Sequence, residues 1–544
     1  MHRGGPPMSF RAFVFPCLAL LACLSPATAI TVDWDGGGVD NKWSTGDNWN
    51  ANVIPATAAP LDDVRFVGSV RPGVDVDSNV SAQTLKFISG AAAFTLGGTG
   101  VINLAGTGTG HDSGLHLRNE SSALQTINNS IVFTGTSIGF NAVSGSMTFN
   151  GNIDMTAATN IRFLGGGGRT TTFNGVISGT GAGQLAFNSG GTFVINNLNS
   201  YTKSTSIWSA TVKLLVDAPS GANGAFGNST GTISMGTTYD GGALTGILLA
   251  SNAVTIGRTI TLASSSTNFP AVTHNYTIGG ETAQISNFTG TITTTNGSGT
   301  KAASKLTVTA AAGGRVNIAN IVRGVGTTGT ADDVVKIGNG IVAITGSSNN
   351  WQGNTLVQAG TFLVNGSVLT SPSGKNVQVS SGAILGGNGT LTREVSLAAG
   401  AILSPGDVSA AGVSLGGKLT VGDLTGLTLA PTSVLRFDRG TFDSSTDDEV
   451  SVLGNLTLAG QLNVTDLGGF GNGAYKLFDW TGLLTYNPAD LTFGNLPSGF
   501  TYTIDTTTWA NSAYLVVTPE PGRALLLFVG LSTLLFNRRR KAVV

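Results

Sequence analysis

Few residues of this 544-residue chain could carry out acid–base or metal chemistry. Beyond the first 29 residues there are three histidines, His111, His116 and His274. His111 and His116 are five positions apart, and residues five apart on a strand face opposite sides, so they are not expected to share a metal. We expect all three to be surface or turn residues.

Carboxylates gather in three short runs: Asp62-Asp63, Asp332-Asp333, and Asp443 with Asp447-Asp448-Glu449. Carboxylate oxygens are ligands that calcium prefers, but no regular Asp and Gly spacing of a calcium loop surrounds these runs. We expect solvated turns there and no metal. The two cysteines, Cys17 and Cys23, both lie in the first 29 residues, which leaves the body without a disulfide, a thiolate zinc site or a cysteine nucleophile.

The composition also limits the function. Charged residues make up only 10% of the chain, too thinly spread to nominate the carboxylate group of a polysaccharide lyase or hydrolase, so we expect no enzyme and no cofactor. Residues 30–518 carry a net charge of about −7, and they show no basic patch that would indicate a nucleic-acid partner.

The N-terminus has the layout of a secretory signal peptide over residues 1–29. Arg3 and Arg11 precede an apolar run over 12–24, and Ala27 and Ala29 form a small-x-small cleavage site. Cleavage there predicts Ile30 as the first mature residue. The alternative is a lipoprotein signal at Cys23, for which the preceding Leu21 is unusual.

The C-terminus combines Pro519-Glu520-Pro521, an apolar run over 524–536, and the basic group Arg538-Arg539-Arg540-Lys541. A helix over the 16 residues 522–537 would be about 24 Å long, slightly short for a bilayer core of about 30 Å. The adjacent cations favour the cytoplasmic side, which would leave the body of the protein outside. We therefore expect one C-terminal hydrophobic helix that spans the membrane.

This tail resembles the PEP-CTERM sorting signal of Gram-negative bacteria. The resemblance rests on Pro519, Glu520, Pro521, Arg538, Arg539 and Arg540. It implies recognition by exosortase, a membrane-embedded protease, removal of the tail, and a cell that secretes exopolysaccharide. The alternative is an ordinary tail anchor in which the Pro-Glu-Pro triplet arose by chance.

The body reads as a stack of short strands. Between residues 340 and 465, short β-prone runs alternate with glycine or Asn/Ser turns, which leaves no room for crossover helices. Comparable runs begin at Ile341, Thr361, Ala383 and Ala401, a spacing near 20 residues. This spacing favours an all-β fold, a right-handed parallel β-helix, over β-sandwiches. We expect about 18 coils between 65 and 430, a rod of roughly 85 Å, and hydrogen-bonded Asn and Thr ladders at inward turns.

A longer internal similarity links the segments 193–216 and 342–364. In both, an apolar strand is followed by an aromatic residue, Tyr201 or Trp351, and then by a strand led by Thr205 or Thr355. The second copy, with Lys336-Ile337-Gly338-Asn339-Gly340 before it, resembles the autotransporter-associated β-strand repeat. That resemblance implies a parallel β-helix in a secreted or surface protein and implies no reaction.

The segments that flank the coil differ from it. Residues 30–66 hold Trp34, Trp43 and Trp49, which we expect to form the core of an N-terminal cap, with a sugar-stacking platform as the alternative. We expect the β-helix over 67–439, a β-rich, partly antiparallel closing region over 440–517, and the sorting signal with its membrane helix over 518–544.

These features predict an exported protein of the cell surface or extracellular space, held at least transiently in the membrane by its C-terminal helix. Its expected partners are an exosortase-type protease and an exopolysaccharide or cell-envelope matrix. The function we expect is structural. A glycan-binding adhesin that uses Trp34, Trp43 and Trp49 is one alternative, and a polysaccharide lyase or hydrolase on a β-helix is another.

Overall fold

The computed structural model describes residues 29–520, except for 107–115, 237–243, 264–272, 295–303, 325–331, 370–372, 409–414 and 442–446, together with Met1 and Gly5. His111, Asp443, Ala27, Pro521 and Arg538-Arg539-Arg540 lie outside the described residues, as do residues 2–4 and 6–28 of the signal peptide predicted over 1–29 and the predicted helix over 522–537. Among the described residues, no helix is long and apolar enough to cross a membrane.

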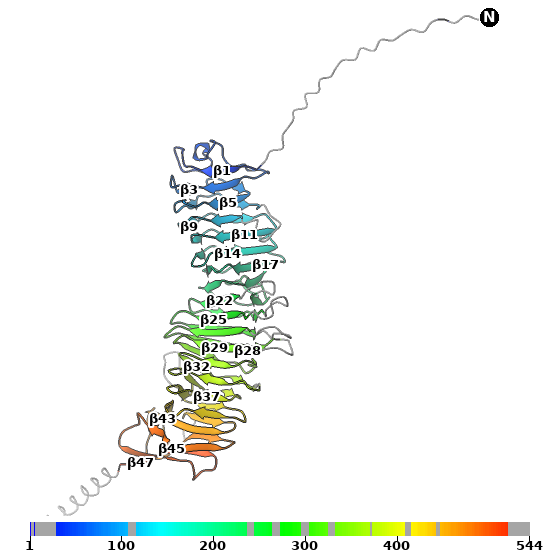
Figure 1. The fold of residues 1–544 in the computed structure, drawn as a ribbon. Helices are drawn as coiled ribbons and strands as arrows, with labels where there is room; N and C mark the ends of the chain where they lie inside the picture. The colour runs from blue at the N-terminus through cyan, green and yellow to red at the C-terminus, as the bar shows by residue number, and fades with distance from the viewer. Residues whose placement is uncertain are drawn as a thin grey trace, which may run out of the picture.

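The described chain is all-β and forms one elongated rod (Figure 1). Strands of successive coils pair in parallel, residue against residue, so that the chain winds through three faces. Helical structure in the described part is limited to one 3-10 turn, Gly46–Asn48. The predicted parallel β-helix is confirmed.

The first face holds β1 (Thr31–Trp34), β2 (Asp63–Phe66), β5 (Thr84–Phe87), β8 (Leu117–Asn119), β11 (Ser137–Ala142), β14 (Asn160–Gly165), β17 (Gln184–Asn188), β19 (Ser204–Ile207), β21 (Ile233–Met235), β24 (Ile260–Leu262), the second halves of β26 (Ile285–Thr294) and β28 (Arg315–Arg323), β33 (Ser367–Val368), β36 (Thr390–Leu391), β39 (Lys418–Val421), β42 (Glu449–Val452) and β44 (Gly473–Trp480).

The second face holds β3 (Gly73–Asp75), β6 (Thr95–Gly97), β9 (Gln125–Ile127), β12 (Met147–Phe149), β15 (Thr170–Phe173), β18 (Thr192–Ile195), β20 (Thr211–Leu214), β22 (Thr245–Ala250), β25 (Asn275–Gly280), β27 (Lys305–Ala310), β29 (Asp333–Ile337), β31 (Thr355–Val357), β34 (Val377–Val379), β37 (Val395–Leu397), β40 (Leu427–Leu429) and the first parts of β43 (Leu456–Asp466) and β45 (Leu484–Phe493).

The third face holds β4 (Val80–Ala82), β7 (Ile102–Leu104), β10 (Ile131–Phe133), β13 (Ile153–Asp154), β16 (Ile177–Ser178), β23 (Thr255–Ile256), the first halves of β26 and β28, β30 (Ile341–Ile344), β32 (Thr361–Val364), β35 (Ile384–Gly387), β38 (Ile402–Pro405), β41 (Val434–Arg439) and the second parts of β43 and β45. An antiparallel hairpin of β46 (Phe500–Asp505) and β47 (Ser512–Pro519) extends the first face beyond β44.

Alternation along each strand places one row of apolar side chains inside the coil, and stacking of coils makes that row continuous. Phe66 lies opposite Phe87 in the next coil with ring centroids 5.0 Å apart. Phe140 and Phe163 repeat the arrangement at 4.0 Å. The interior is therefore a single apolar core that runs along the rod.

Coil length varies more than the sequence suggested. A coil takes about 18 residues where Val377 pairs with Val395, but about 36 where Thr211 pairs with Ile247. The second face has fifteen strands from β3 to β40 within the described residues, so the expected count of about 18 coils between 65 and 430 is too high. Connections at the corners lengthen a coil without disturbing the stack, because loop closure costs little extra free energy per added residue.

The asparagine ladder lies on the outside of the rod. Each Nδ2–H group donates to the Oδ1 atom of the preceding coil, from Asn150 to Asn128 at 2.7 Å, from Asn174 to Asn150 at 2.8 Å and from Asn196 to Asn174 at 3.0 Å. The expectation of a ladder at inward turns is corrected here. These asparagines follow the last inward residue of β9, β12, β15 and β18, so alternation turns them outward.

The coil also extends past both predicted boundaries. β1 and β2 already pair in parallel before residue 67, and β43, β44 and β45 continue the three faces beyond 439. Within the described part of the closing region, antiparallel pairing is limited to β47, which pairs with β44 and with β46.

Candidate functional site: buried polar groups and an exposed lateral face

The three N-terminal tryptophans are part of the core. Trp34 and Trp49 are 0% exposed and Trp43 is 3% exposed. The ring of Trp49 lies 5.1 Å from that of Trp34 and 4.7 Å from that of Trp43, both edge-on. Since no ring face is open, a sugar cannot stack on them, and the glycan-contact alternative for these three residues is wrong. They form the core of the cap, above Phe66.

The two described histidines are buried, in contrast to the expected surface positions. His116 Nδ1 accepts a hydrogen bond from the Gly139 N–H group at 3.2 Å, and His274 Nδ1 accepts one from Leu244 at 3.1 Å. In both cases a ring nitrogen accepts a hydrogen bond from a backbone N–H group of a neighbouring coil. Both residues are therefore integrated in the packing of the rod.

Four of the seven described carboxylates in the three runs are buried, so the expected solvated turns are a second correction. Asp62, Asp332, Asp447 and Asp448 are all inaccessible or nearly so. Asp62 accepts from the Ile30 N–H group at 3.0 Å, and Asp332 accepts from Ser304 at 2.7 Å. Short carboxylates can thus satisfy backbone donors that a corner leaves unpaired. No group of three His, Cys, Asp or Glu residues suited to a metal occurs among the described residues.

Asp448 is the most perturbed of these acids. Its Oδ2 atom accepts from the Asp438 N–H group at 2.8 Å, while Oδ1 is buried and accepts no hydrogen bond within the described residues. Burial raises the pKa of Asp448 to about 8, and the nearby carboxylate of Asp438 adds to the rise although Arg439 opposes it. A carboxyl group at this position keeps its proton at neutral pH.

Five cations are buried at corners of the coil and donate to backbone carbonyls: Lys203, Arg258, Lys336, Arg393 and Arg439. The Lys336 ammonium donates to the carbonyl oxygens of Ile337, Gly338 and Ala359 at 2.9, 2.7 and 2.9 Å, and burial lowers its pKa to about 8. Lys336 opens the motif that resembles the autotransporter-associated repeat. The motif lysine therefore acts as a structural donor to glycine-rich turns.

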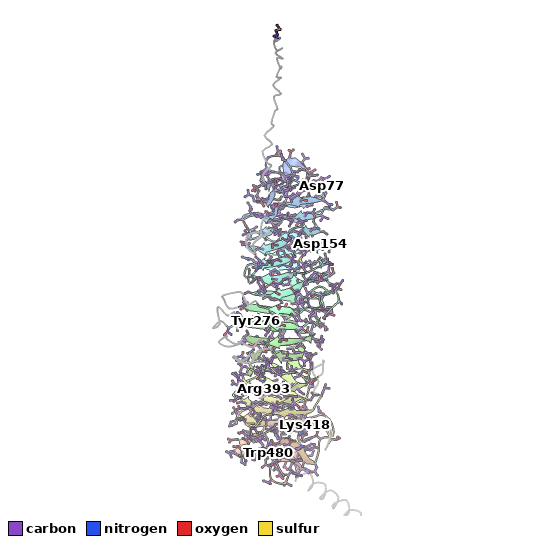
Figure 2. The ribbon with its side chains drawn as sticks, turned by 90° about the vertical axis from the view of Figure 1, so that its right-hand side faces the viewer. Asp77, Asp154, Tyr276, Arg393, Lys418 and Trp480 are labelled. Atoms are coloured by element: carbon purple, nitrogen blue, oxygen red, sulfur yellow. The ribbon has the colours of Figure 1, made fainter. Side chains whose placement is uncertain are left out.

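Arg393 shows the same role most fully. It is 0% exposed, donates through Nη1 to the Gly353 carbonyl at 2.6 Å and through Nη2 to the Trp351 carbonyl, and lies 5.0 Å from the centre of the Trp351 ring. Burial lowers its pKa to about 10. Figure 2 labels Arg393 in the lower half of the rod, with Asp77, Asp154 and Tyr276 at successive levels above it. These labelled polar groups are spread along the rod.

The internal similarity corresponds to a shared corner unit. The Tyr201 hydroxyl lies 3.0 Å from Thr205 Oγ1, and the Trp351 Nε1–H group donates to Thr355 Oγ1 at 3.1 Å. All four side chains are buried. Thr205 lies in β19 on the first face, however, whereas Thr355 begins β31 on the second. The second copy is therefore the same local unit displaced by one face of the coil.

Each unit also contains an asparagine that connects three coils. Asn199 Oδ1 accepts from the Ile177 N–H group at 2.7 Å and its Nδ2 donates to the Ala225 carbonyl at 2.8 Å. Asn349 accepts from Ile321 at 2.7 Å in the same way. The repeated pattern is thus asparagine, aromatic and threonine at fixed spacing, and its function is to hold corners together.

An aromatic residue that the sequence analysis did not single out lies on the outside of the first face. The Arg162 guanidinium lies 4.7 Å from the centre of the Trp208 ring, and both side chains are half-buried. Nearby, Gln184 Nε2 donates to Ser206 Oγ at 2.8 Å. Trp208 follows Ser204 and Ser206 at alternate positions, and that alternation was the available signal for an outward indole.

No protein-family model matches the chain, so the resemblance to a sorting signal rests on the residues of the tail alone. A stretch of 171 residues is 31% identical to the adhesin BmaC autotransporter of Brucella suis biovar 1 (strain 1330). The match covers 31% of this chain and only 5% of that protein.

Proposed function

We propose that this chain is a surface-associated structural protein whose product is a long, rigid β-helix. The observation that carries the proposal is the parallel stack, continuous along the second face from β3 to β45, in which buried acids, cations and histidines have backbone partners. The similarity of one stretch to an autotransporter adhesin supports a location at the cell surface.

In this proposal the rod is exported by residues 1–29 and sorted by residues 519–541 through an exosortase-type protease. Its outward Thr and Asn side chains then make weak, repeated contacts with an exopolysaccharide or cell-envelope matrix. Weak contacts that repeat along one rigid body add up through effective concentration, so length itself determines how firmly the rod is held.

Deletion of residues 519–544 is expected to shift the protein from the envelope fraction to the culture medium or periplasm. The reason is that the deletion removes the apolar run and the basic group, while among the described strands it shortens only β47, by its last residue Pro519. Fractionation and immunoblotting of cells with and without the exosortase measure the effect. Pro519→Ala with Pro521→Ala serves as the control that keeps the apolar run.

Two outcomes would count against this sorting pathway. If the full chain has the same size and location with and without the exosortase, the tail is a plain anchor. If the deletion variant stays in the envelope, the tail does not determine location.

A second candidate function is glycan binding by an adhesin. It is favoured by the description of the related protein as an adhesin and by the Arg162–Trp208 pair on the lateral face. An indole beside a guanidinium and the amide of Gln184 offers both an apolar surface and hydrogen-bond donors for a sugar. In this candidate function the glycan site lies on the first face of the coil and not at the buried N-terminal tryptophans.

The third candidate, a polysaccharide lyase or hydrolase, gains no support from the described residues. A calcium-dependent lyase needs several acids around one cation, and the described part of the chain contains no such group.

A further inference from the structure

The two ends of the rod differ in how they close. At the N-terminal end, the outer edge of β1 is occupied, because the Asn50 N–H group donates to the Asp33 carbonyl at 2.9 Å and Trp49 bridges to Trp34. At the C-terminal end, the second and third faces stop at β45. Its outer edge makes no backbone hydrogen bond to a further strand within the described residues.

Apolar side chains cover this C-terminal end without being buried. Phe500 and Tyr502 of β46 are partly buried against the core, and Phe493 of β45 is 42% exposed. The ring of Tyr502 lies 6.2 Å from that of Phe493, and the ring of Phe500 lies 6.0 Å from that of Phe470. Together with Tyr486 and Leu496, which are also only partly buried, Phe493, Phe500 and Tyr502 form what we call the terminal aromatic patch.

The tail leaves the rod beside this patch. Pro519, the last residue of β47, lies opposite Phe500, and the Glu520 N–H group donates to the Gly499 carbonyl at 3.3 Å. The apolar run over 524–536 begins four residues after Glu520. Four extended residues span at most about 14 Å, and the polar layer of one leaflet is roughly 5–8 Å thick. A tail that enters a bilayer therefore holds the patch within about 14 Å of the hydrocarbon core, close to the lipid headgroups.

We propose that the terminal aromatic patch rests in the headgroup layer of the membrane, so that the rod stands upright on its C-terminal end. The inference depends on the proposed function, because it takes the tail as membrane-inserted. Tyrosine and other aromatic rings favour the membrane–water interface, and an exposed apolar patch at the end of a rod needs a partner.

A second copy of the chain fits this end less well. The four residues 487–490 turn the corner of β45 and interrupt its register with β43. They include Pro488, which cannot donate to a ladder, and the charged Asp490. Proline, charge and a bulge on an edge strand are features that prevent pairing with another chain.

The test uses the full chain in vesicles, with Cys17 and Cys23 replaced by Ser. A single cysteine at the exposed Ser498, beside the patch, carries an environment-sensitive fluorophore, and the matched control carries it at the exposed Ser122 in the N-terminal half of the rod. The vesicles contain phosphatidylethanolamine, phosphatidylglycerol and lipids brominated near the headgroup. We expect the probe at position 498 to be quenched several-fold more strongly than the probe at 122, and Phe493→Ser to reduce that difference.

Three results would overturn the inference, and each has its own meaning. If the chain floats with the vesicles while both probes are quenched equally, the tail anchors the chain, but the rod does not stand upright on the terminal aromatic patch. If the chain does not float, the tail is no anchor, and both this inference and that part of the proposed function fail. If the probe at 498 is shielded from water yet not quenched by lipid, the tail or another copy covers the patch instead.

Discussion

Asp448→Asn is expected to stabilise the C-terminal coils by about 2–4 kcal/mol at pH 8. The gain arises because a shift of one pKa unit corresponds to about 1.4 kcal/mol of stability. The new amide also brings a buried hydrogen-bond donor, which costs part of this gain. The folded protein holds a proton on Asp448 up to a pKa of about 8, whereas the unfolded chain loses it near the ordinary aspartate pKa of 3.8. Between these values the folded state binds more protons than the unfolded state. Stability therefore falls as the pH rises from about 4 to about 8.

Urea unfolding of the wild type and of Asp448→Asn at several pH values between 4 and 8 measures this slope. The variant is expected to flatten it. Asp490→Asn, which removes a carboxylate from the exposed corner of β45, is the matched control and is expected to change stability by less than about 0.5 kcal/mol. Equal slopes in wild type and Asp448→Asn would show that Asp448 is ionised in the folded protein.

Arg393→Ala is expected to destabilise the coils that it connects by about 2–4 kcal/mol. The substitution leaves the Trp351 and Gly353 carbonyls without their buried donor and opens a cavity beside the Trp351 ring. Removal of a buried positive charge, whose pKa burial lowers to about 10, offsets part of the loss.

Hydrogen exchange locates this effect, because a solenoid loses stability locally around a weakened coil. The amides of β31, β34 and β37 are expected to lose protection in Arg393→Ala, while those of the N-terminal coils keep it. Arg436→Ala, which removes an exposed arginine from β41, is the matched control. Unchanged protection of β31 in Arg393→Ala would mean that the guanidinium does not hold this corner.

The stack and its corner units could be predicted from the sequence because each depends on local pattern. Alternation in runs such as Ile341–Ile344 sets the inward row, and the spacing from Trp351 to Thr355 sets the hydrogen bond of the corner. The tryptophan cap was also predictable as one of two interpretations. The other interpretation, a sugar-stacking platform, was wrong because the sequence does not show whether the ring faces of Trp34 and Trp49 are exposed or buried.

The buried polar groups could not be predicted in the same way. Whether Asp332 or His116 is exposed depends on which backbone donor of a neighbouring coil reaches it, and that neighbour lies more than 20 residues away. Because the connections at the corners vary in length, the number of residues between contacting positions of neighbouring coils cannot be predicted from composition. The terminal aromatic patch has the same origin, since Phe493 and Tyr502 meet only because the first face continues past β44 as a hairpin.

The parallel register between successive coils is the central claim, and disulfide formation between engineered cysteines tests it most directly. Thr148 lies opposite Thr172, and neighbouring strands are about 4.8 Å apart, within the Cα distance that a disulfide tolerates. In a chain with Cys17→Ser and Cys23→Ser, the pair Thr148→Cys and Thr172→Cys is expected to oxidise readily, and the pair Thr148→Cys and Thr170→Cys, offset by two residues, much more slowly. Equal oxidation of both pairs, or none of either, would contradict the stacked coil.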